Sequence, residues 1–127
     1  MTTPATGADR EREWALLAAR AASVKGGDDT VVLDVSGVLV ITDAFVITSG
    51  RNTRQVRAIA EEVEARLKAE PGVAPLRTEG SAGAEWVLLD YGDFVVHVFL
   101  DETRRHYQLE RLWADAPRLE WEPVGSS

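Results

Sequence analysis

The alternation of apolar and polar side chains is clearest in two β-rich runs, 86–91 and 94–100, which flank Gly92-Asp93. A Gly-Asp pair between such runs is typical of a two-residue hairpin turn. The turn predicts a register that pairs Asp90 with Val95, Leu88 with His97 and Trp86 with Phe99. Because side chains alternate along a strand, the remaining residues share one face, which we expect to be core: Val87, Leu89, Tyr91, Phe94, Val96, Val98 and Leu100. The opposite face mixes apolar and polar side chains.

Helical spacing of apolar residues appears in three other stretches. The first begins at Asp9 and ends at Gly26-Gly27, and the second follows Asn52 or Thr53 as a possible cap and ends at 70–72. A third helix is predicted from Asp101, as its cap, to about Trp113. Runs rich in β-branched residues predict strands over 30–35, 38–42 and 45–48, and a short strand is predicted over 76–79.

This order of elements predicts a single α/β domain, with a mixed sheet of about five strands and three helices. The apolar faces of the three predicted helices are sufficient to cover one face of the sheet well and the other only partly. We expect residues 1–8 to form a disordered tail, 9–117 to form the domain, and 118–127 to form an irregular tail. No place in the fold is predicted for Trp121.

Composition and charge narrow the possible functions. The 127 residues suffice for one domain, and the absence of cysteine excludes disulfides and thiolate metal sites. Residues 79–127 hold ten acids and four arginines, a net −6 of the total −7. Nucleic-acid affinity depends on neutralising phosphates, so we expect no direct DNA binding and favour a basic protein partner.

No apolar run is long enough for a membrane span and no secretory signal is evident, so a cytoplasmic protein is expected.

Two groups of residues are candidates for chemistry. Asp90 and His97 lie diagonally on the mixed face, but an acid–base or metal pair would need a third group, so a structural cross-strand pair is the simpler interpretation. The strand–helix junction at 49–54 could attract an anion through backbone N–H groups. It lacks the glycines and lysine of a P-loop, so a capped junction is favoured over nucleotide binding.

Several stretches together resemble one family, the ribosomal silencing factors (RsfS or iojap). The resemblance covers about 9–117 and is carried by Thr42 to Ile47, Ser49 to Val56, Glu79-Gly80, Ala84 to Asp93, Val96 to Phe99, and Arg104 to Trp113. It implies a fold similar to nucleotidyltransferases. Enzymes of that fold carry paired carboxylates after the Gly-Ser turn, whereas here the next acid after Ser49-Gly50 is Glu61, so we expect no catalytic metal site.

The resemblance also implies a non-enzymatic factor with no cofactor. Such a factor binds the large ribosomal subunit through ribosomal protein L-fourteen, blocks association with the small subunit and forms homodimers when free. We expect docking through the mixed hairpin face, with Tyr107 at its edge: Trp86, Leu88, Asp90, His97, Phe99 and Tyr107. The alternatives are a nucleotidyltransferase-related enzyme or nucleotide-binding protein using 49–54, and a homodimeric scaffold that pairs only with itself.

Overall fold

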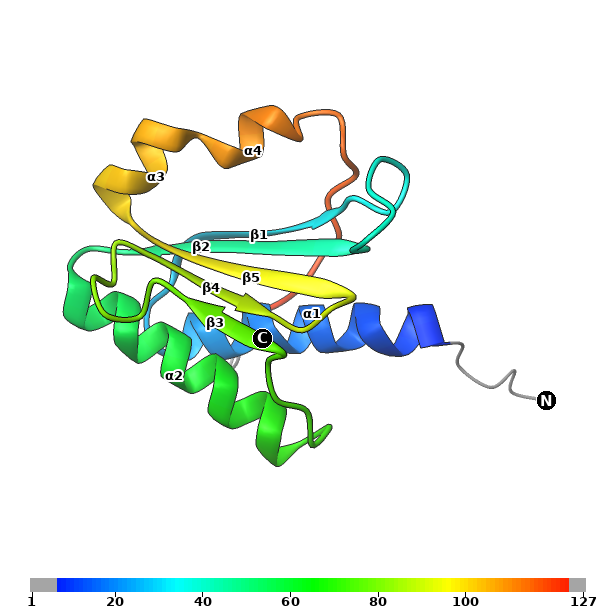
Figure 1. The fold of residues 1–127 in the computed structure, drawn as a ribbon, viewed down its shortest axis with the longest axis horizontal. Helices are drawn as coiled ribbons and strands as arrows, with labels where there is room; N and C mark the ends of the chain where they lie inside the picture. Colours follow the sequence, from blue (N-terminus) through cyan, green and yellow to red (C-terminus); the bar gives the residue numbers. More distant parts are fainter. Residues whose placement is uncertain (1–6, 124–127) are drawn as a thin grey trace.

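A five-stranded sheet in the order β1-β2-β5-β4-β3 organises the fold, in a computed structural model that describes residues 7–123 (Figure 1). Strands β2 and β5 run parallel, and the other neighbouring strands are antiparallel. The elements are α1 (Gly7–Val24), β1 (Asp28–Asp34), β2 (Ala44–Gly50), α2 (Thr53–Ala69), β3 (Arg77–Glu79), β4 (Trp86–Asp90), β5 (Phe94–Leu100), α3 (Asp101–Tyr107) and α4 (Leu109–Leu112). The prediction of one α/β domain with a mixed five-stranded sheet is confirmed.

The sheet lies between two helical layers. Helices α1 and α2 pack against one face, and the shorter α3 and α4 lie over the other (Figure 1). Five alanines of α1 are buried and allow the helix to approach the sheet closely: Ala15, Ala18, Ala19, Ala21 and Ala22. No helix within residues 7–123 is both long and apolar enough to cross a membrane.

The hydrophobic core is divided by the sheet into two clusters. The larger cluster joins α1 and α2 to the sheet and contains the predicted core face of the hairpin, with Phe94, Val96 and Val98 buried. The smaller cluster lies under α4 and the segment after it, where Phe99 and Phe45 are buried and Trp113 packs against them. Both sheet faces therefore bury apolar side chains, but the α3–α4 side is covered less completely.

The predicted strand over 38–42 is wrong, because these residues belong to a loop that we call the 35–43 loop. The Asp34 carboxylate accepts hydrogen bonds from the hydroxyl and the N–H of Ser36, which turn the chain away from β1. The same two bonds lower the pKa of Asp34. The N–H of Val35 donates to the carbonyl of Asp43 at 2.9 Å and closes the loop.

The predicted final helix is interrupted. Gln108 adopts a left-handed conformation with φ 49° and separates α3 from α4. Asp101 is the first residue of α3 rather than its cap, and the capping residue Leu100 makes no side-chain capping bond. A carboxylate in the first turn still interacts favourably with the helix dipole.

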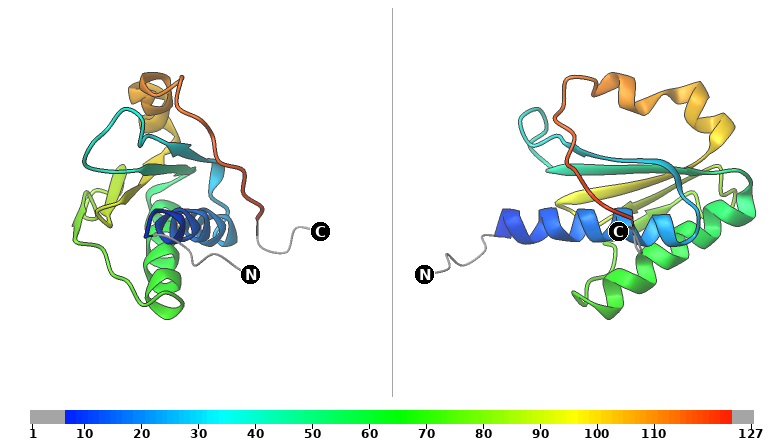
Figure 2. Two further views of the ribbon diagram at one scale, coloured as in Figure 1. Left: turned by 90° about the vertical axis from the view of Figure 1, so that its right-hand side faces the viewer. Right: turned by 180° about the vertical axis from the view of Figure 1, so that it is seen from behind.

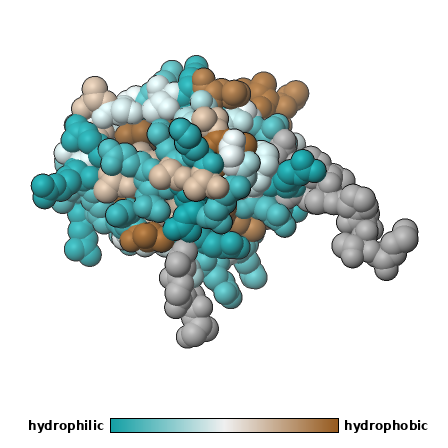
Figure 3. All heavy atoms as spheres, turned by 90° about the horizontal axis from the view of Figure 1, so that it is seen from below, coloured by the Kyte–Doolittle hydropathy of each residue, from teal (hydrophilic) through white to brown (hydrophobic). Residues whose placement is uncertain are grey.

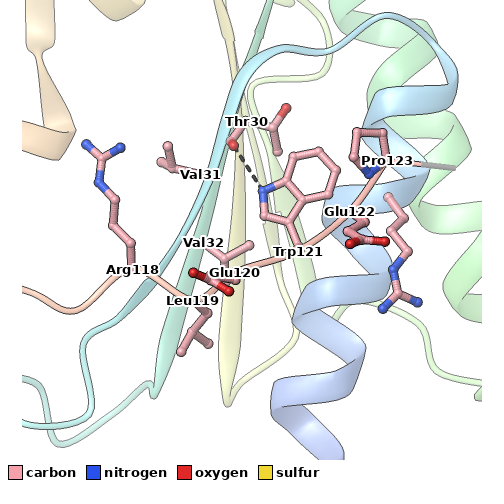
Figure 4. Close-up of a pocket in the computed structure, with 10 residues that line it drawn as sticks. Thr30, Val31, Val32, Arg118, Leu119, Glu120, Trp121, Glu122 and Pro123 are labelled. Atoms are coloured by element: carbon pink, nitrogen blue, oxygen red, sulfur yellow. Dashed lines mark hydrogen bonds between the residues drawn. The ribbon is translucent and has the colours of Figure 1, made fainter. Parts of the chain in front are cut away.

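The segment after α4 runs beside the edge strand β1 (Figure 2). The N–H of Asp34 donates to the Pro117 carbonyl, and the N–H of Leu119 donates to the Val32 carbonyl, each at 2.8 Å. Trp121 follows, and its indole N–H donates to the Thr30 carbonyl at 3.1 Å (Figure 4). Part of the tail expected to be irregular is thus ordered against the sheet. Residues 1–6 and 124–127, which include most of the expected disordered tail, lie outside the described range.

Candidate functional site

The hairpin has the register that its turn predicts. Trp86 pairs with Phe99, Leu88 with His97, and Asp90 with Val95. Gly92 has φ +90°, a conformation that glycine adopts without strain, and the N–H of Tyr91 donates to the Phe94 carbonyl across the turn. The mixed face therefore exists as the sequence indicates.

Trp86, Phe99 and Tyr107 form an aromatic platform on this face. The Trp86 ring stacks on Phe99 with centroids 4.7 Å apart, and Tyr107 from α3 lies 5.0 Å from it. Gly80 packs against the Trp86 carbonyl, where a side chain would clash. Phe99 is fully buried, Trp86 is partly exposed, and Tyr107 has 54% of its surface exposed. The platform thus presents Trp86 and Tyr107, with Phe99 beneath them.

His97 lies buried beside the platform, with 5% of its surface exposed. Its Nδ1 accepts a hydrogen bond from the Trp86 indole N–H at 3.1 Å, and its ring meets Phe45 edge-on at 4.9 Å. Burial lowers the pKa of His97 to about 4, so the imidazole is neutral near pH 7. His97 supports the surface from within and is not itself exposed to a partner.

Asp90 is bonded elsewhere, which corrects the inferred pairing with His97. Its carboxylate accepts the Gly92 N–H at 2.8 Å and lies 3.3 Å from the Arg77 guanidinium. The described residues contain no hydrogen bond between Asp90 and His97, whose Nε2 is buried without a partner. Asp90 therefore stabilises the turn and joins β4 to β3.

An apolar hollow of about 310 Å³ adjoins the platform, between the 35–43 loop and the hairpin. Its wall includes Leu39, Ile41, Leu76, Leu88 and Val95, with Arg77 and Asp90 at one side. Leu88 is partly exposed at this position. The hollow extends the mixed face toward the loop.

Sequence reasoning missed the most exposed apolar side chains of this region. Val38, Val40 and Ile41 on the 35–43 loop are 65%, 101% and 85% exposed, and Leu76 is 76% exposed. The apolar run over 38–41 is typical of a strand, and the signal for a loop is the Ser36-Gly37 pair before it, which is typical of a turn. Ile41 and Leu76 also line the hollow, and an exposed apolar group of this kind is typical of an interaction site.

The side covered by α1 and α2 has a different character. Figure 3 shows this side with a mostly hydrophilic surface, on which hydrophobic residues occupy smaller areas. The platform, the hollow and the 35–43 loop instead lie on the α3–α4 side of the sheet. We call these three features together the docking surface, because they are the surface for which partner binding is proposed below.

The 49–54 junction is a capped helix start. Asn52 accepts the Gln55 N–H at 2.8 Å, and the Gln55 side chain accepts the Arg51 N–H at 2.7 Å. The Gln55 amide also donates to the carbonyls of Lys25 and Gly26, tying the end of α1 to the start of α2. These backbone N–H groups are thus used within the chain, which is the favoured structural interpretation. Among the residues whose side chains the structure describes, no group of three His, Asp or Glu is placed to hold a metal.

Arg104 is buried, which is unusual for an arginine. Its guanidinium donates to the carbonyls of Asp28 and Asp29, to the Ser49 hydroxyl and, at 2.8 Å, to the Glu110 carboxylate. These contacts fasten α3 and α4 to the ends of β1 and β2. Arg104 therefore positions the helix that carries Tyr107.

Comparison with known proteins gives a consistent result. The family model "Ribosomal silencing factor during starvation" (RsfS) matches residues 8–127. The chain is 42% identical to the ribosomal silencing factor RsfS of Halalkalibacterium halodurans over 113 residues, which are 89% of this chain and 96% of that protein. It resembles the crystal structure of CV0518 from Chromobacterium violaceum with TM-score 0.78 and 36% identity, over 91% of this chain and 94% of that one.

A more distant relative comes from mouse. The protein named "mitochondrial assembly of ribosomal large subunit protein 1" is 34% identical over 90 residues, which are 67% of this chain and 38% of that protein.

Proposed function

This chain belongs to the ribosomal silencing factor (RsfS) family, and from that premise we propose that it binds the large ribosomal subunit through ribosomal protein L-fourteen. By occupying that protein it keeps the small subunit from joining and so represses translation. The name of the mouse relative refers to the ribosomal large subunit and supports the large subunit as the partner. The proposed place of action is the cytoplasm.

The observation that carries the proposal is the docking surface itself. It joins a partly exposed tryptophan, an exposed tyrosine and an exposed apolar loop on one side of the sheet. Tryptophan and tyrosine are frequent hot spots because they bury a large area at low entropic cost. All six residues predicted for docking lie on or under this surface, with Trp86, Leu88, Asp90 and Tyr107 accessible and His97 and Phe99 supporting them.

Charge favours a basic partner. The half of the sequence that contains the hairpin and α3 has net charge −6, and Asp93 at the turn and Glu85 before β4 are exposed. Ribosomal proteins are typically basic, so opposite charges would steer the encounter. We therefore expect association to slow as salt concentration rises.

The proposed mechanism is steric occlusion and needs no chemical step. What it requires is a rigid surface, and the hairpin, the Arg104 contacts and the Asp34 turn supply that rigidity. Because the same surface is apolar, we propose that free molecules pair through it as homodimers and separate on docking. A non-enzymatic role follows from this mechanism.

Removal of the exposed tryptophan tests the proposal. Trp86→Ala should weaken binding to purified large subunits at least about thirtyfold, the loss typical of a hot-spot residue, as measured by co-sedimentation. Ile41→Asp should also weaken binding, whereas Val24→Asp, which changes an exposed apolar residue of α1, should not. Circular dichroism and the melting temperature verify that each variant is folded. Unchanged binding by Trp86→Ala would show that docking uses another surface.

A further inference from the structure

We propose that His97 is a positioning residue for docking, because its Nδ1 fixes the Trp86 indole in the orientation that the partner meets. The inference rests on the proposed function and adds to it a buried residue that touches no partner. Its basis is the 3.1 Å hydrogen bond from the indole N–H to the imidazole.

Stacking alone does not determine how the indole lies. Trp86 rests on Phe99 with an interplanar angle of 29° and leans on Tyr107 at 48°. A tryptophan χ2 torsion has broad, roughly two-fold preferences, so a flipped ring could also lie on Phe99. In the flipped ring the N–H would point away from His97. The hydrogen bond therefore selects one of the two ring orientations and decides which edge of the indole faces the partner.

The acceptor in this bond is itself firmly held. His97 lies in β5, which is paired with β2 on one side at Ile47 and with β4 on the other at Leu88. The Phe45 ring packs edge-on against the imidazole at 4.9 Å. A ring in the middle of a paired sheet moves little, so it can hold a half-exposed tryptophan.

The protonation state of the imidazole is also suited to this role. Only neutral histidine offers a nitrogen lone pair, and acceptance at Nδ1 places the proton on Nε2. The charged side chains that line the hollow with His97 are Arg77 and Asp90, which pair with each other at 3.3 Å. Neither is hydrogen-bonded to the imidazole within the described residues. The acceptor therefore remains available at neutral pH.

Loss of the acceptor should lower affinity without abolishing binding. Without this bond the indole is free to flip and to shift on Phe99, and ordering such a side chain on docking weakens binding about three- to tenfold. His97→Leu and His97→Asn form a matched pair, because both remove the ring and have nearly the same size. Only asparagine retains an acceptor oxygen close to the position of Nδ1.

The experiment measures the binding of four variants to purified large subunits: His97→Leu, His97→Asn, Trp86→Phe and Trp86→Ala. It also follows hydrogen exchange of the Trp86 indole N–H by nuclear magnetic resonance in the free protein. We expect His97→Leu and Trp86→Phe each to weaken binding about three- to tenfold, and the double variant to bind no more weakly than either single variant. His97→Asn should retain the wild-type affinity and the slow exchange of the indole N–H. Trp86→Phe keeps the test decisive if a His97 variant does not fold.

The two possible failures can be told apart. Wild-type affinity in folded His97→Leu or in Trp86→Phe, together with loss of binding in Trp86→Ala, overturns the role of His97 and leaves the docking surface in place. Equal loss in His97→Leu and His97→Asn also overturns it, because the ring alone would then matter. Wild-type affinity in Trp86→Ala overturns the proposed docking surface itself.

Discussion

For His97 and Asp90 the sequence predicts the face of the sheet but not the hydrogen-bond partners. The alternation of the hairpin placed both on the mixed face, and the structure has them there. Their hydrogen-bond partners were not predictable, since Asp90 is bonded to Gly92 and Arg77 and His97 to Trp86. The alternation of side chains along a strand determines which face of the sheet each residue lies on. Which of several polar neighbours becomes its hydrogen-bond partner depends on interatomic distances in the folded sheet.

The buried imidazole should make stability depend on pH. Burial depresses the pKa of His97 from 6.5 to about 4, so between these values the unfolded chain binds a proton that the native state does not. The free energy of unfolding is therefore unaffected by His97 protonation above pH 6.5. It decreases as the pH falls toward 4, by about 3 kcal/mol in total. Urea unfolding at a series of pH values measures it.

The matched control for that measurement is His97→Leu, which has no group that titrates at this position. Its free energy of unfolding should fall less between pH 6.5 and 4 than that of the wild type. Parallel curves for the two proteins would mean that His97 titrates normally in the native state.

The elements differ in how well local sequence specified them. The hairpin, α1 and α2 were predicted because their turns, caps and apolar stripes agree with the tertiary contacts. The 35–43 loop was not predicted because its apolar run is typical of a strand, although Asp34 and Ser36 form a local turn before it. The break at Gln108 was not predicted because it depends on distant groups. In the second case Arg104 draws α3 toward β1 and β2, and its bond to Glu110 spans the break.

Removal of Arg104 should loosen α3 and α4. Arg104→Met leaves the Glu110 carboxylate and two backbone carbonyls without their donor, so we expect a loss of about 2–4 kcal/mol in the free energy of unfolding. Arg105→Met is the control, because the adjacent arginine is exposed and its replacement should change stability by less than about 0.5 kcal/mol. Urea denaturation compares the two. Equal stability of both variants would contradict the role given to the buried guanidinium.

The two sides of the molecule differ in packing, and the proposed function gives them separate tasks. The side with α1 and α2 holds the larger core and, at its edge, the segment around Trp121, while the opposite side holds the smaller core cluster and the surface proposed for docking. Trp121 had no predicted place because its contacts, the Thr30 carbonyl and the larger core cluster, are distant in sequence. This separation lets stability and docking be altered independently.

Trp121→Ala should therefore lower stability without changing docking. The variant loses a half-buried ring and its hydrogen bond to β1, which we expect to cost about 2 kcal/mol. Glu122→Ala, at an exposed neighbour, should be neutral. The melting temperature reports the first effect, and co-sedimentation with large subunits at 10 °C below the melting temperature of the variant reports the second. A fall in affinity as large as that of Trp86→Ala would contradict the separation.

The proposed partner and the proposed surface can be tested together by site-specific photo-crosslinking to purified large subunits. A photoreactive phenylalanine replaces Ile41 on the 35–43 loop in one variant and the exposed Glu61 on α2 in another. We expect the probe at position 41 to attach to ribosomal protein L-fourteen, identified by mass spectrometry, and the probe at position 61 to attach to no ribosomal protein. Attachment mainly from position 61, or attachment from position 41 to a different ribosomal component, would contradict the account.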